Sequence, residues 1–397
     1  MRFAVDAHAI GRHLTGNEVY IRSLLGGFAE IDKKSEFITY VSEPGAERWI
    51  PRRFAVRQVS GNPWSRLGWD LTQLVRADRP DLIHVQYTAP LHTRGVPTVV
   101  TVHDVSFLEH PEYFTVARRS QLRLTVGRTV KRAARILTVS EFSRDAILRA
   151  YDIRPDRVSV IPNAANPEFR VVGRERAQKS VRAQLRFDAP YVLSVGDLAP
   201  RKNQIGLIAA FSKLLTEHPH LKHHLVLTGK ETWFTPKVRE AARSCGFASR
   251  IHFTGFVSDE ELLELYNACE CFVFPSFYEG FGLPILEAMA CGRAVACSNT
   301  SSMPEVADGA GLLFDPHRTG EITRAMKDIL LDAELRGRLE RLGLQRAALF
   351  TWKKSARATL DVYREVVQET GRETGKETGG TERRRARAAL AAGQRKR

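Results

Sequence analysis

Short runs of apolar, β-branched residues alternate along the chain with longer stretches of helical periodicity. In the first half the runs predict strands at FAVDA (3–7), FITYV (37–41), LIHVQ (82–86), TVVTVHD (98–104), ILTVS (136–140) and VSVIP (158–162). In the second half they predict strands at YVLSVG (191–196), HLVLTG (224–229), IHFTG (251–255), CFVFP (271–275), AVACS (294–298) and GLLFD (311–315). Near-continuous apolar strands separated by helices are typical of parallel sheets covered on both faces. Two such series predict an α/β chain with two doubly wound, Rossmann-like domains.

Polar, turn-rich sequence at 163–188 separates the two series of strands. We therefore expect an N-terminal domain over 1–172 and a C-terminal domain over 173–350. Apolar positions at helical spacing predict a last helix within 351–368. Residues 369–397 contain an ETG repeat followed by a basic segment that cannot bury a core, so we expect a disordered basic tail.

The composition is that of a globular protein, with 43% hydrophobic and 26% charged residues. No apolar run approaches the roughly 18–20 residues that a membrane span needs. The first residues, MRFAVDAHAIG, lack the apolar segment of a signal peptide and are typical of a first buried strand, so we expect a cytoplasmic protein. The net charge of +15 favours anionic partners: nucleic acid, anionic lipid or phosphorylated small molecules.

The five cysteines all lie between 245 and 297 and fit no metal-binding spacing. We expect free buried thiols, with Cys269 and Cys271 on the same face of a strand because they are two residues apart. The sequence contains no P-loop, GxGxxG or GxSxG motif, and no DxD pair ends a strand. A divalent-metal site is therefore not indicated.

Ligands of open parallel sheets bind outside the carboxyl ends of the strands, so polar residues that follow strands are the candidates for a site. In FYEGFGLPILEAMACG, Glu279 and Glu287 flank a glycine-rich turn that opens a helix at Pro284. Gly280 and Gly282 would let the backbone approach an anion such as a diphosphate, which the free amides favour. Glu287, expected in the first helical turn, could accept hydrogen bonds from a ribose diol; alternatively it only complements the helix end.

Three other motifs follow predicted strands. In GDLAPRKNQ, Arg201 and Lys202 form a basic pair suited to phosphate oxygens, unless it is ordinary solvated surface. In TVHDVSF, His103 could hydrogen-bond a substrate hydroxyl, although a histidine at a strand end is often structural. In HLTGNEVYIRSLL, Gly16 precedes an amphipathic helix whose amides could face phosphate or acceptor, as at many helices that begin after glycine.

Together these motifs resemble the retaining glycosyltransferases of family four, which have the two-domain GT-B fold. The resemblance covers about residues 1–368 and is strongest in the second half. The similar motifs follow the family's order: TVHD (101–104), VSEFSRDAI (139–147), VIPNAAN (160–166), VGDLAPRKNQ (195–204), FTGFVSDEEL (253–262) and FPSFYEGFGLPILEAMACGRAVACSNTSSMPEVADGAGLLFDP (274–316). The last of these includes the family's signature of two glutamates separated by seven residues.

The resemblance implies that the C-terminal domain holds a nucleotide sugar. Arg201 and Lys202 would contact the diphosphate, and Glu287 would bind the ribose hydroxyls. Glu279 would hold the transferred sugar together with backbone amides of the residues that follow it, namely Phe281, Gly282 and Leu283.

The resemblance also implies roles for the N-terminal half. His103 would reach the sugar, Gly16 would lie near the diphosphate and the acceptor, and the helix at 351–368 would cross back to pack on the N-terminal domain. Such enzymes work without a metal or other cofactor, and their retaining reaction is drawn as a front-face displacement. The turn at Gly16 and Asn17 departs from the Gly-Gly or Gly-Ile-Gly turn of many relatives, which affects the acceptor side.

We therefore expect a bacterial hexosyltransferase of polysaccharide biosynthesis, with GDP-mannose favoured as donor, UDP-glucose next, and a saccharide or lipid-linked acceptor. One alternative is a nucleotide-sugar epimerase on the same fold. Another is a non-catalytic basic binding protein. The sequence has no stacking platform or recognition helix for nucleic acid, so no nucleic-acid partner is expected.

A basic amphipathic segment at 115–140 is a candidate for peripheral contact with the anionic inner face of the membrane. It has seven basic residues and no acidic one: Arg118, Arg119, Arg123, Arg128, Lys131, Arg132 and Arg135. Leucines and valines interleave with them, a pattern that can lie on anionic lipid. The alternative is a solvated helix face over the N-terminal sheet. The basic tail at 369–397 would add attraction to the membrane.

Overall fold

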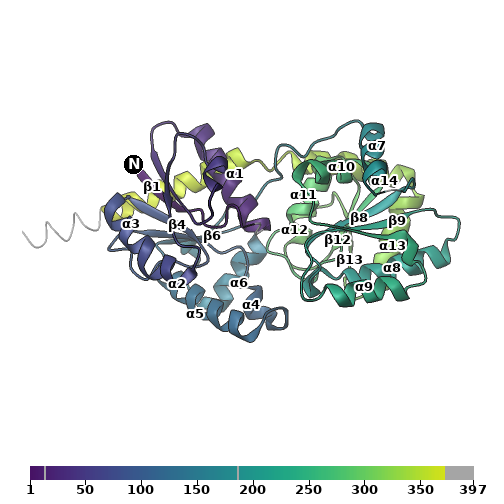
Figure 1. Ribbon diagram of the computed structural model, residues 1–397, viewed down its shortest axis with the longest axis horizontal. Helices are drawn as coiled ribbons and strands as arrows, with labels where there is room; N and C mark the ends of the chain where they lie inside the picture. Colours follow the sequence, from purple (N-terminus) through teal and green to yellow (C-terminus); the bar gives the residue numbers. More distant parts are fainter. Residues whose placement is uncertain (13–14, 186, 372–397) are drawn as a thin grey trace, which may run out of the picture. The chain divides into compact units, whose positions relative to one another are not determined.

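The computed structural model describes residues 1–12, 15–185 and 187–371. They form two parallel sheets, of seven and six strands, which confirms the predicted α/β class (Figure 1). The chain divides into two compact units. The first comprises Met1–Thr101, Arg128–Ile136 and the segment from Ala356 onwards, and the second comprises Val102–Gly127 and Leu137–Ser355. The predicted tail begins too early, because residues 369–371 are still helical, and residues 372–397 lie outside the described residues.

The first sheet has the strand order β3-β2-β1-β4-β5-β6-β7. Its strands are β1 (Arg2–Asp6), β2 (Glu36–Val41), β3 (Ala55–Gln58), β4 (Leu82–Gln86), β5 (Thr98–Thr101), β6 (Arg135–Thr138) and β7 (Val158–Val160). Strand β1 pairs in parallel with β2 on one side, where Phe3 lies opposite Phe37, and with β4 on the other. The order reverses next to β1, so the carboxyl end of β1 lies where a doubly wound sheet places a ligand.

Helices connect these strands. They are α1 (Thr15–Ile31), α2 (Pro63–Ser65), α3 (Leu71–Asp78), α4 (Ser106–Glu109), α5 (Val116–Arg132) and α6 (Glu141–Tyr151). Short 3₁₀ turns lie at Ala46–Trp49 (η1), Pro111–Tyr113 (η3) and Pro155–Arg157 (η4), and a π-helical turn, η2, spans Arg66–Asp70.

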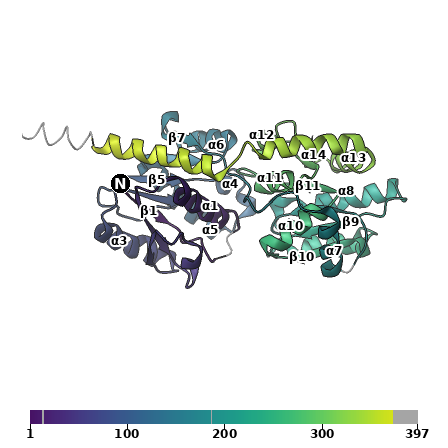
Figure 2. The ribbon, with the colours of Figure 1, turned by 90° about the horizontal axis from the view of Figure 1, so that it is seen from above.

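The predicted last helix is present over residues 352–371, and Figure 2 shows it alongside β1 and α1. Tyr363, on this helix, is fully buried in the first unit. Its ring packs 5.1 Å from Phe3 and 5.7 Å from Phe28 between centroids. Its hydroxyl lies 2.6 Å from Nδ1 of His84 on β4. The end of the described chain is therefore part of the first unit's core.

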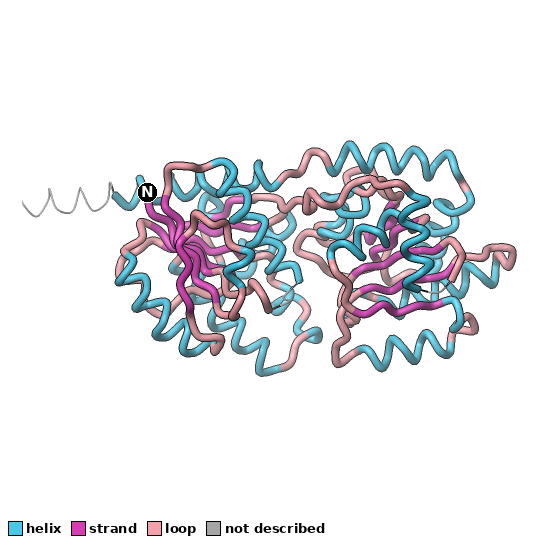
Figure 3. Tube along the Cα trace, turned by 45° about the horizontal axis from the view of Figure 1, so that its top comes forward, coloured by secondary structure: helices cyan, strands magenta, loops and turns pink. Residues whose placement is uncertain are grey.

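The second sheet has the order β10-β9-β8-β11-β12-β13. Its strands are β8 (Tyr191–Val195), β9 (His224–Thr228), β10 (Ile251–Gly255), β11 (Cys271–Phe274), β12 (Val295–Ser298) and β13 (Leu312–Phe314). The helices are α7 (Arg174–Leu185), α8 (Gln204–Glu217), α9 (Thr235–Ser244), α10 (Asp259–Ala268), α11 (Leu283–Ala290), α12 (Met303–Ala307), α13 (Thr319–Leu331) and α14 (Ala333–Ala347), with 3₁₀ turns η5 (Pro200–Lys202) and η6 (Ala248–Arg250). Helices flank this sheet on both sides (Figure 3).

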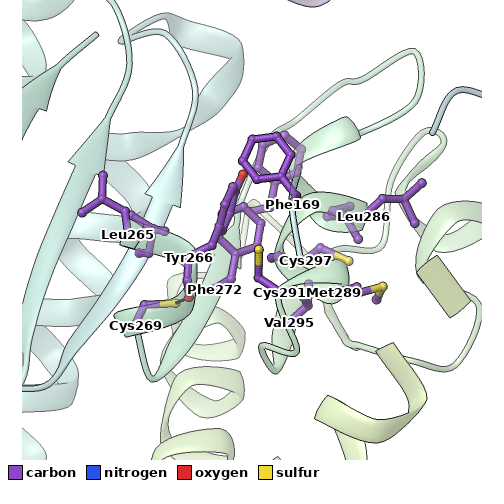
Figure 4. Close-up of a cluster of buried hydrophobic side chains, with 14 of the residues drawn as sticks. Phe169, Leu265, Tyr266, Cys269, Phe272, Leu286, Met289, Cys291, Val295 and Cys297 are labelled. Atoms are coloured by element: carbon purple, nitrogen blue, oxygen red, sulfur yellow. Dashed lines mark hydrogen bonds between the residues drawn. The ribbon is translucent and has the colours of Figure 1, made fainter. Parts of the chain in front are cut away.

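Two apolar clusters cover the two faces of the second sheet. Phe272 and Phe274 of β11 point into one cluster, shown in Figure 4, and Cys271 and Val273 point into the other. This alternation is the two-residue period of a strand buried on both faces. Cys269 belongs to the first cluster, so the expectation that it shares a strand face with Cys271 is wrong. Cys269 is the C-cap of α10 and precedes the strand.

The expectation of free, buried thiols is confirmed for four of the five cysteines. All five thiols are free, and four of them are buried while Cys245 is half-buried. Burial raises the pKa of Cys269 and of Cys297, each to about 12. Buried thiols of this kind are inert core residues.

All twelve predicted strands are present, with two differences in the first sheet. Strand β3 was not predicted, because as an edge strand it exposes most of its AVRQ side chains and has no apolar run. Strand β5 ends at Thr101, so the expectation that it continues to Asp104 is wrong. The predicted boundary near 172 lies between β7 and β8; whether each predicted domain folds by itself stays a prediction.

Candidate active site

The loops that follow β8 and β11 meet in the second unit. The turn η5 carries Arg201 and Lys202 after β8, and the carbonyl of Arg201 accepts a hydrogen bond of 2.8 Å from the amide of Phe277 after β11. Glu279 lies between the two cations. Its Oε2 is 2.8 Å from Nη1 of Arg201, and its Oε1 is 2.6 Å from Nζ of Lys202. The structure therefore brings three predicted site residues together.

The charges of these three side chains are set by burial and by one another. Burial alone would raise the pKa of Glu279, but Arg201 and Lys202 outweigh it and lower that pKa to about 2. Burial would lower the pKa of Arg201, yet Glu279 keeps it above its usual value. Burial and the charge of Arg201 lower the pKa of Lys202. The two cations share the carboxylate of Glu279, and the carboxylates of Asp104 and Asp197 lie near enough to act on the charge of Arg201 as well.

Glycines shape the loops around this charge cluster. Gly196, directly after β8, has φ of 155°, and a Cβ there would come 3.1 Å from the Lys202 side chain. Gly282 is the N-cap of α11 with φ of 104°, in the left-handed region that favours glycine. Pro284 in the first turn of α11 removes an amide that would have no helical partner. The amide of Ile285 already donates to the Gly282 carbonyl at 2.9 Å, so the amides of Phe281, Gly282 and Leu283 are the candidate donors to a ligand.

Serine hydroxyls fix the loop between Glu279 and Gly282. The Oγ of Ser301 accepts a hydrogen bond of 3.0 Å from the amide of Glu279. The hydroxyl of Ser302 lies 2.9 Å from the carbonyls of both Glu279 and Phe281. With these carbonyls held, the intervening amides keep one orientation.

His103 packs against the same loop. A Cβ on Gly280 would lie 2.4 Å from the His103 carbonyl, so only glycine permits this approach. The hydroxyls of Ser140 and Ser143 donate to the Gly280 carbonyl at 2.7 and 3.1 Å. Burial lowers the pKa of His103 to about 4, which leaves the imidazole neutral at physiological pH. His103 was predicted to reach the site from the N-terminal domain, but residues 102–127 belong to the second unit together with the loop.

Glu287 lies in α11, in its second turn rather than in the predicted first turn. Its side chain is buried, with 8% of the residue exposed. Tyr266 donates a hydrogen bond of 2.9 Å to its Oε2. Burial raises the pKa of Glu287 to about 7, although the Tyr266 hydroxyl opposes the rise. A carboxylate complements a helix end within the first turn, so the position of Glu287 in the second turn speaks against that alternative, and its role towards a ribose stays a prediction.

Gly16 lies in the first turn of α1, in the first unit. No other heavy atom lies within 4 Å of a Cβ placed there. Its predicted place near the diphosphate and the acceptor stays a prediction.

Sequence reasoning missed the residues that position the predicted ones. These are Ser140, Ser143, Ser301, Ser302 and Tyr266. The serines stand in VSEFS and NTSSMPE, two stretches within the motifs that carry the resemblance, but serine is common and neither stretch indicates a partner. Tyr266 resembles any core aromatic in a helical pattern until its hydroxyl is seen to meet Glu287.

The predicted membrane segment, residues 115–140, includes the whole of helix α5. Val126 and Val130, two of its apolar residues, are fully buried, whereas Leu124 is 74% exposed. The interleaved valines therefore pack inside the protein and cannot reach lipid. None of the described helices is long and apolar enough to cross a membrane. Among the described residues no group of three His, Cys, Asp or Glu side chains could hold a metal ion.

Comparisons with known proteins place this geometry in a family. Residues 176–346 match the family model of glycosyl transferases group 1, and residues 14–169 match that of Glycosyltransferase Family 4. The chain is 35% identical over 269 residues to O-antigen chain mannosyltransferase B of Escherichia coli, which covers 67% of this chain and 70% of that protein. It is 32% identical over 305 residues to the serotype-specific mannosyltransferase WbdA of Escherichia coli, covering 73% of this chain but only 37% of WbdA.

Solved structures show the same fold at lower identity. Alr3699/HepE of Anabaena, in complex with UDP and glucose, matches with a TM-score of 0.74 and 19% identity, over 92% of this chain and all of that one. Sucrose-phosphate synthase from Thermosynechococcus elongatus matches with a TM-score of 0.73 and 21% identity, over 93% of this chain and all of that one. The chain is a glycosyltransferase of the group 1 and family 4 type, with the GT-B fold.

Proposed function

We propose that the protein transfers a hexose from a nucleotide sugar to a saccharide or lipid-linked acceptor, with retention of configuration and without a metal. The observation that carries the proposal is the buried cluster in which Arg201 and Lys202 share the carboxylate of Glu279 beside the first turn of α11. A guanidinium and an ammonium group fixed side by side next to a helix N-terminus are the donors that a diphosphate favours.

The cluster supplies what the departure of a nucleoside diphosphate requires. Negative charge develops on the diphosphate oxygen as its bond to the sugar carbon breaks. Arg201 and Lys202 are already fixed by Glu279, so they can stabilise that charge with little reorganisation. Removing one preorganised donor of this kind typically costs about 2.7–4 kcal/mol of activation free energy. In this reaction the two side chains take the part that a divalent metal plays elsewhere.

The sugar and the ribose would be held by the two glutamates. Glu279 and the amides of Phe281, Gly282 and Leu283 would bind the sugar hydroxyls, with the neutral imidazole of His103 as a further hydrogen-bonding group. Glu287 would accept hydrogen bonds from the ribose diol. In a front-face displacement, the acceptor oxygen bonds to the sugar carbon on the side from which the diphosphate leaves. The acceptor's proton passes to the departing diphosphate oxygen.

Mannose is proposed ahead of glucose because the two Escherichia coli relatives are named as mannosyltransferases. UDP-glucose remains second, since HepE has the same fold and was solved with UDP-glucose. A thermal-shift screen against GDP-, UDP-, ADP- and dTDP-sugars would identify the donor base. We expect GDP-mannose to raise the melting temperature most.

Transfer itself is tested with the selected donor and a panel of saccharide and lipid-linked acceptors, with and without EDTA. Arg201→Ala and Glu287→Ala should abolish transfer while circular dichroism stays unchanged, and EDTA should have no effect. Arg338→Ala, at an exposed position on α14, is the matched control. Full turnover in both site variants would refute the assignment. Conversion of the donor sugar in the absence of any acceptor would favour the epimerase.

A further inference from the structure

A basic pocket lies within the first unit, apart from the cluster around Glu279. It has a volume of about 730 Å³ and is formed by the 89–98 loop and the last turns of α5, with Thr72 of α3 at its side. Arg94, Arg128 and Arg132 line it, and no acidic side chain does. The pocket is therefore suited to an anionic group.

The three arginines of the pocket have no ion-pair partner among the described residues. Nη2 of Arg128 donates to the carbonyls of Pro90 and Leu91, at 3.0 and 2.5 Å, which fixes it at the pocket wall. Burial and the charge of Arg132 lower the pKa of Arg128, so an anion that enters would relieve repulsion between them. Arg94 and Arg132 are exposed at the rim.

Exposed apolar side chains lie beside this pocket. The amide of Leu91 donates a 2.9 Å hydrogen bond to the carbonyl of Leu67, which joins the pocket loop to η2. Trp64 and Trp69, just before and within η2, are 77% and 67% exposed, and Leu91 is 49% exposed. Exposed tryptophans on a segment joined to a basic loop are typical of proteins that lie at a membrane surface.

We propose that this face of the first unit docks on an anionic lipid bilayer, with a lipid phosphate in the pocket of Arg94, Arg128 and Arg132 and with Trp64 and Trp69 at the headgroup level. The charge complementarity is one-sided, since the pocket offers three guanidinium groups and no carboxylate. The exposed aliphatic side chain of Leu91 favours a bilayer over nucleic acid, because a bilayer offers it an apolar phase, whereas bases could stack only on the two indoles. This docking surface does not depend on which donor sugar the protein uses.

Co-sedimentation of the full chain with vesicles tests the charged part of this surface. We expect binding to vesicles of 30% phosphatidylglycerol in phosphatidylcholine, and little to pure phosphatidylcholine. A basic residue near such a surface contributes roughly fivefold in affinity, so Arg94→Ala with Arg132→Ala should weaken binding about 25-fold. The matched control is Arg338→Ala with Arg341→Ala, two exposed cations of α14 whose loss changes the net charge equally.

Tryptophan fluorescence tests the apolar part. Brominated phosphatidylcholine mixed into the anionic vesicles should quench the emission, and the variant Trp64→Phe with Trp69→Phe should lose this quenching. Trp233→Phe, which changes a tryptophan that is 67% exposed in the second unit, should keep it. Donor-induced thermal shifts in all variants should equal those of the unchanged protein, which separates a failure of docking from a failure of the proposed function.

Four results would overturn the proposal. The first is equal binding of the protein to neutral and anionic vesicles, and the second is an equal loss of vesicle binding in the α14 control variant. The third is that vesicle binding is lost only when residues 372–397 are removed, and the fourth is that the protein binds RNA which vesicles cannot displace. Each of these would assign the basic charge of the chain to something other than this face.

Discussion

Replacing Glu287 by glutamine should make the protein more stable and less active, and the gain in stability should depend on pH. The carboxyl is buried, it accepts a hydrogen bond from the hydroxyl of Tyr266, and burial raises its pKa from 4.5 to about 7. A raised pKa means that the folded state resists ionisation of this group. Glutamine can accept the same hydrogen bond but never ionises.

The magnitude follows from proton linkage. Below pH 4.5 the carboxyl is protonated in both the folded and the unfolded state, so it does not affect the free energy of unfolding through ionisation. Between 4.5 and about 7 only the unfolded state ionises, and the folded protein loses about 1.4 kcal/mol of stability per pH unit. Above about pH 7 the loss levels off near 3 kcal/mol. Glu287→Gln removes this loss.

Calorimetry of the two proteins at pH 5 and pH 8 measures the effect. For a unit of this size about 3 kcal/mol corresponds to a shift in melting temperature on the order of 6–12 °C. We expect the melting temperature of the variant to rise by that amount at pH 8 and by only a fraction of it at pH 5. The variant Glu260→Gln, on the exposed first turn of α10, should show no such pH dependence. A gain that is equal at both pH values, or a loss at pH 8, would refute the reasoning.

Three further predictions follow from the same loops. If the proposed ribose diol donates to ionised Glu287, donor affinity measured calorimetrically should rise up to about tenfold per pH unit towards pH 7 and then level off; a flat profile would contradict this. Glu279→Gln should lower the free energy of unfolding by about 3 kcal/mol at pH 7, and the unchanged protein should lose this extra stability as the pH falls from 4.5 through about 2. Denaturant titrations that show no difference between the two proteins at pH 7 would count against this prediction. Gly280→Ala should cost about 1–3 kcal/mol and most of the activity because its Cβ would meet the His103 carbonyl, whereas Gly26→Ala on the exposed side of α1 should be neutral or stabilising; equal melting temperatures would exclude the clash.

The sequence predicts the strands and the polar residues that follow them well, because both depend on local patterns. A strand buried on both faces needs an unbroken apolar run, and all twelve such runs form strands. Arg201, Lys202 and Glu279 stand directly after such runs, so parallel pairing of β8 with β11 brings them to the same edge of the sheet.

What the sequence does not reveal depends on contacts between distant segments. The hydroxyls of Ser140 and Ser143 meet a carbonyl more than 130 residues away, at Gly280, and serine carries no pattern that indicates such a partner. Strand β3 pairs only with β2 and has no buried run of its own. The position of Glu287 in the second turn of α11 also depends on where the helix begins, and periodicity does not determine that residue closely.

The two glutamates of the signature have opposite electrostatic environments, and this difference separates their roles. Glu279 is buried between two cations, so it stays ionised at any physiological pH and keeps Arg201 and Lys202 in place. Glu287 is as buried, and among the described residues it accepts a hydrogen bond only from the neutral hydroxyl of Tyr266, so its ionised form is costly. A chain selected for stability alone would carry an apolar or amide side chain at 287. The proposed ribose diol would offset this cost, because its two hydroxyls could donate to the ionised carboxylate.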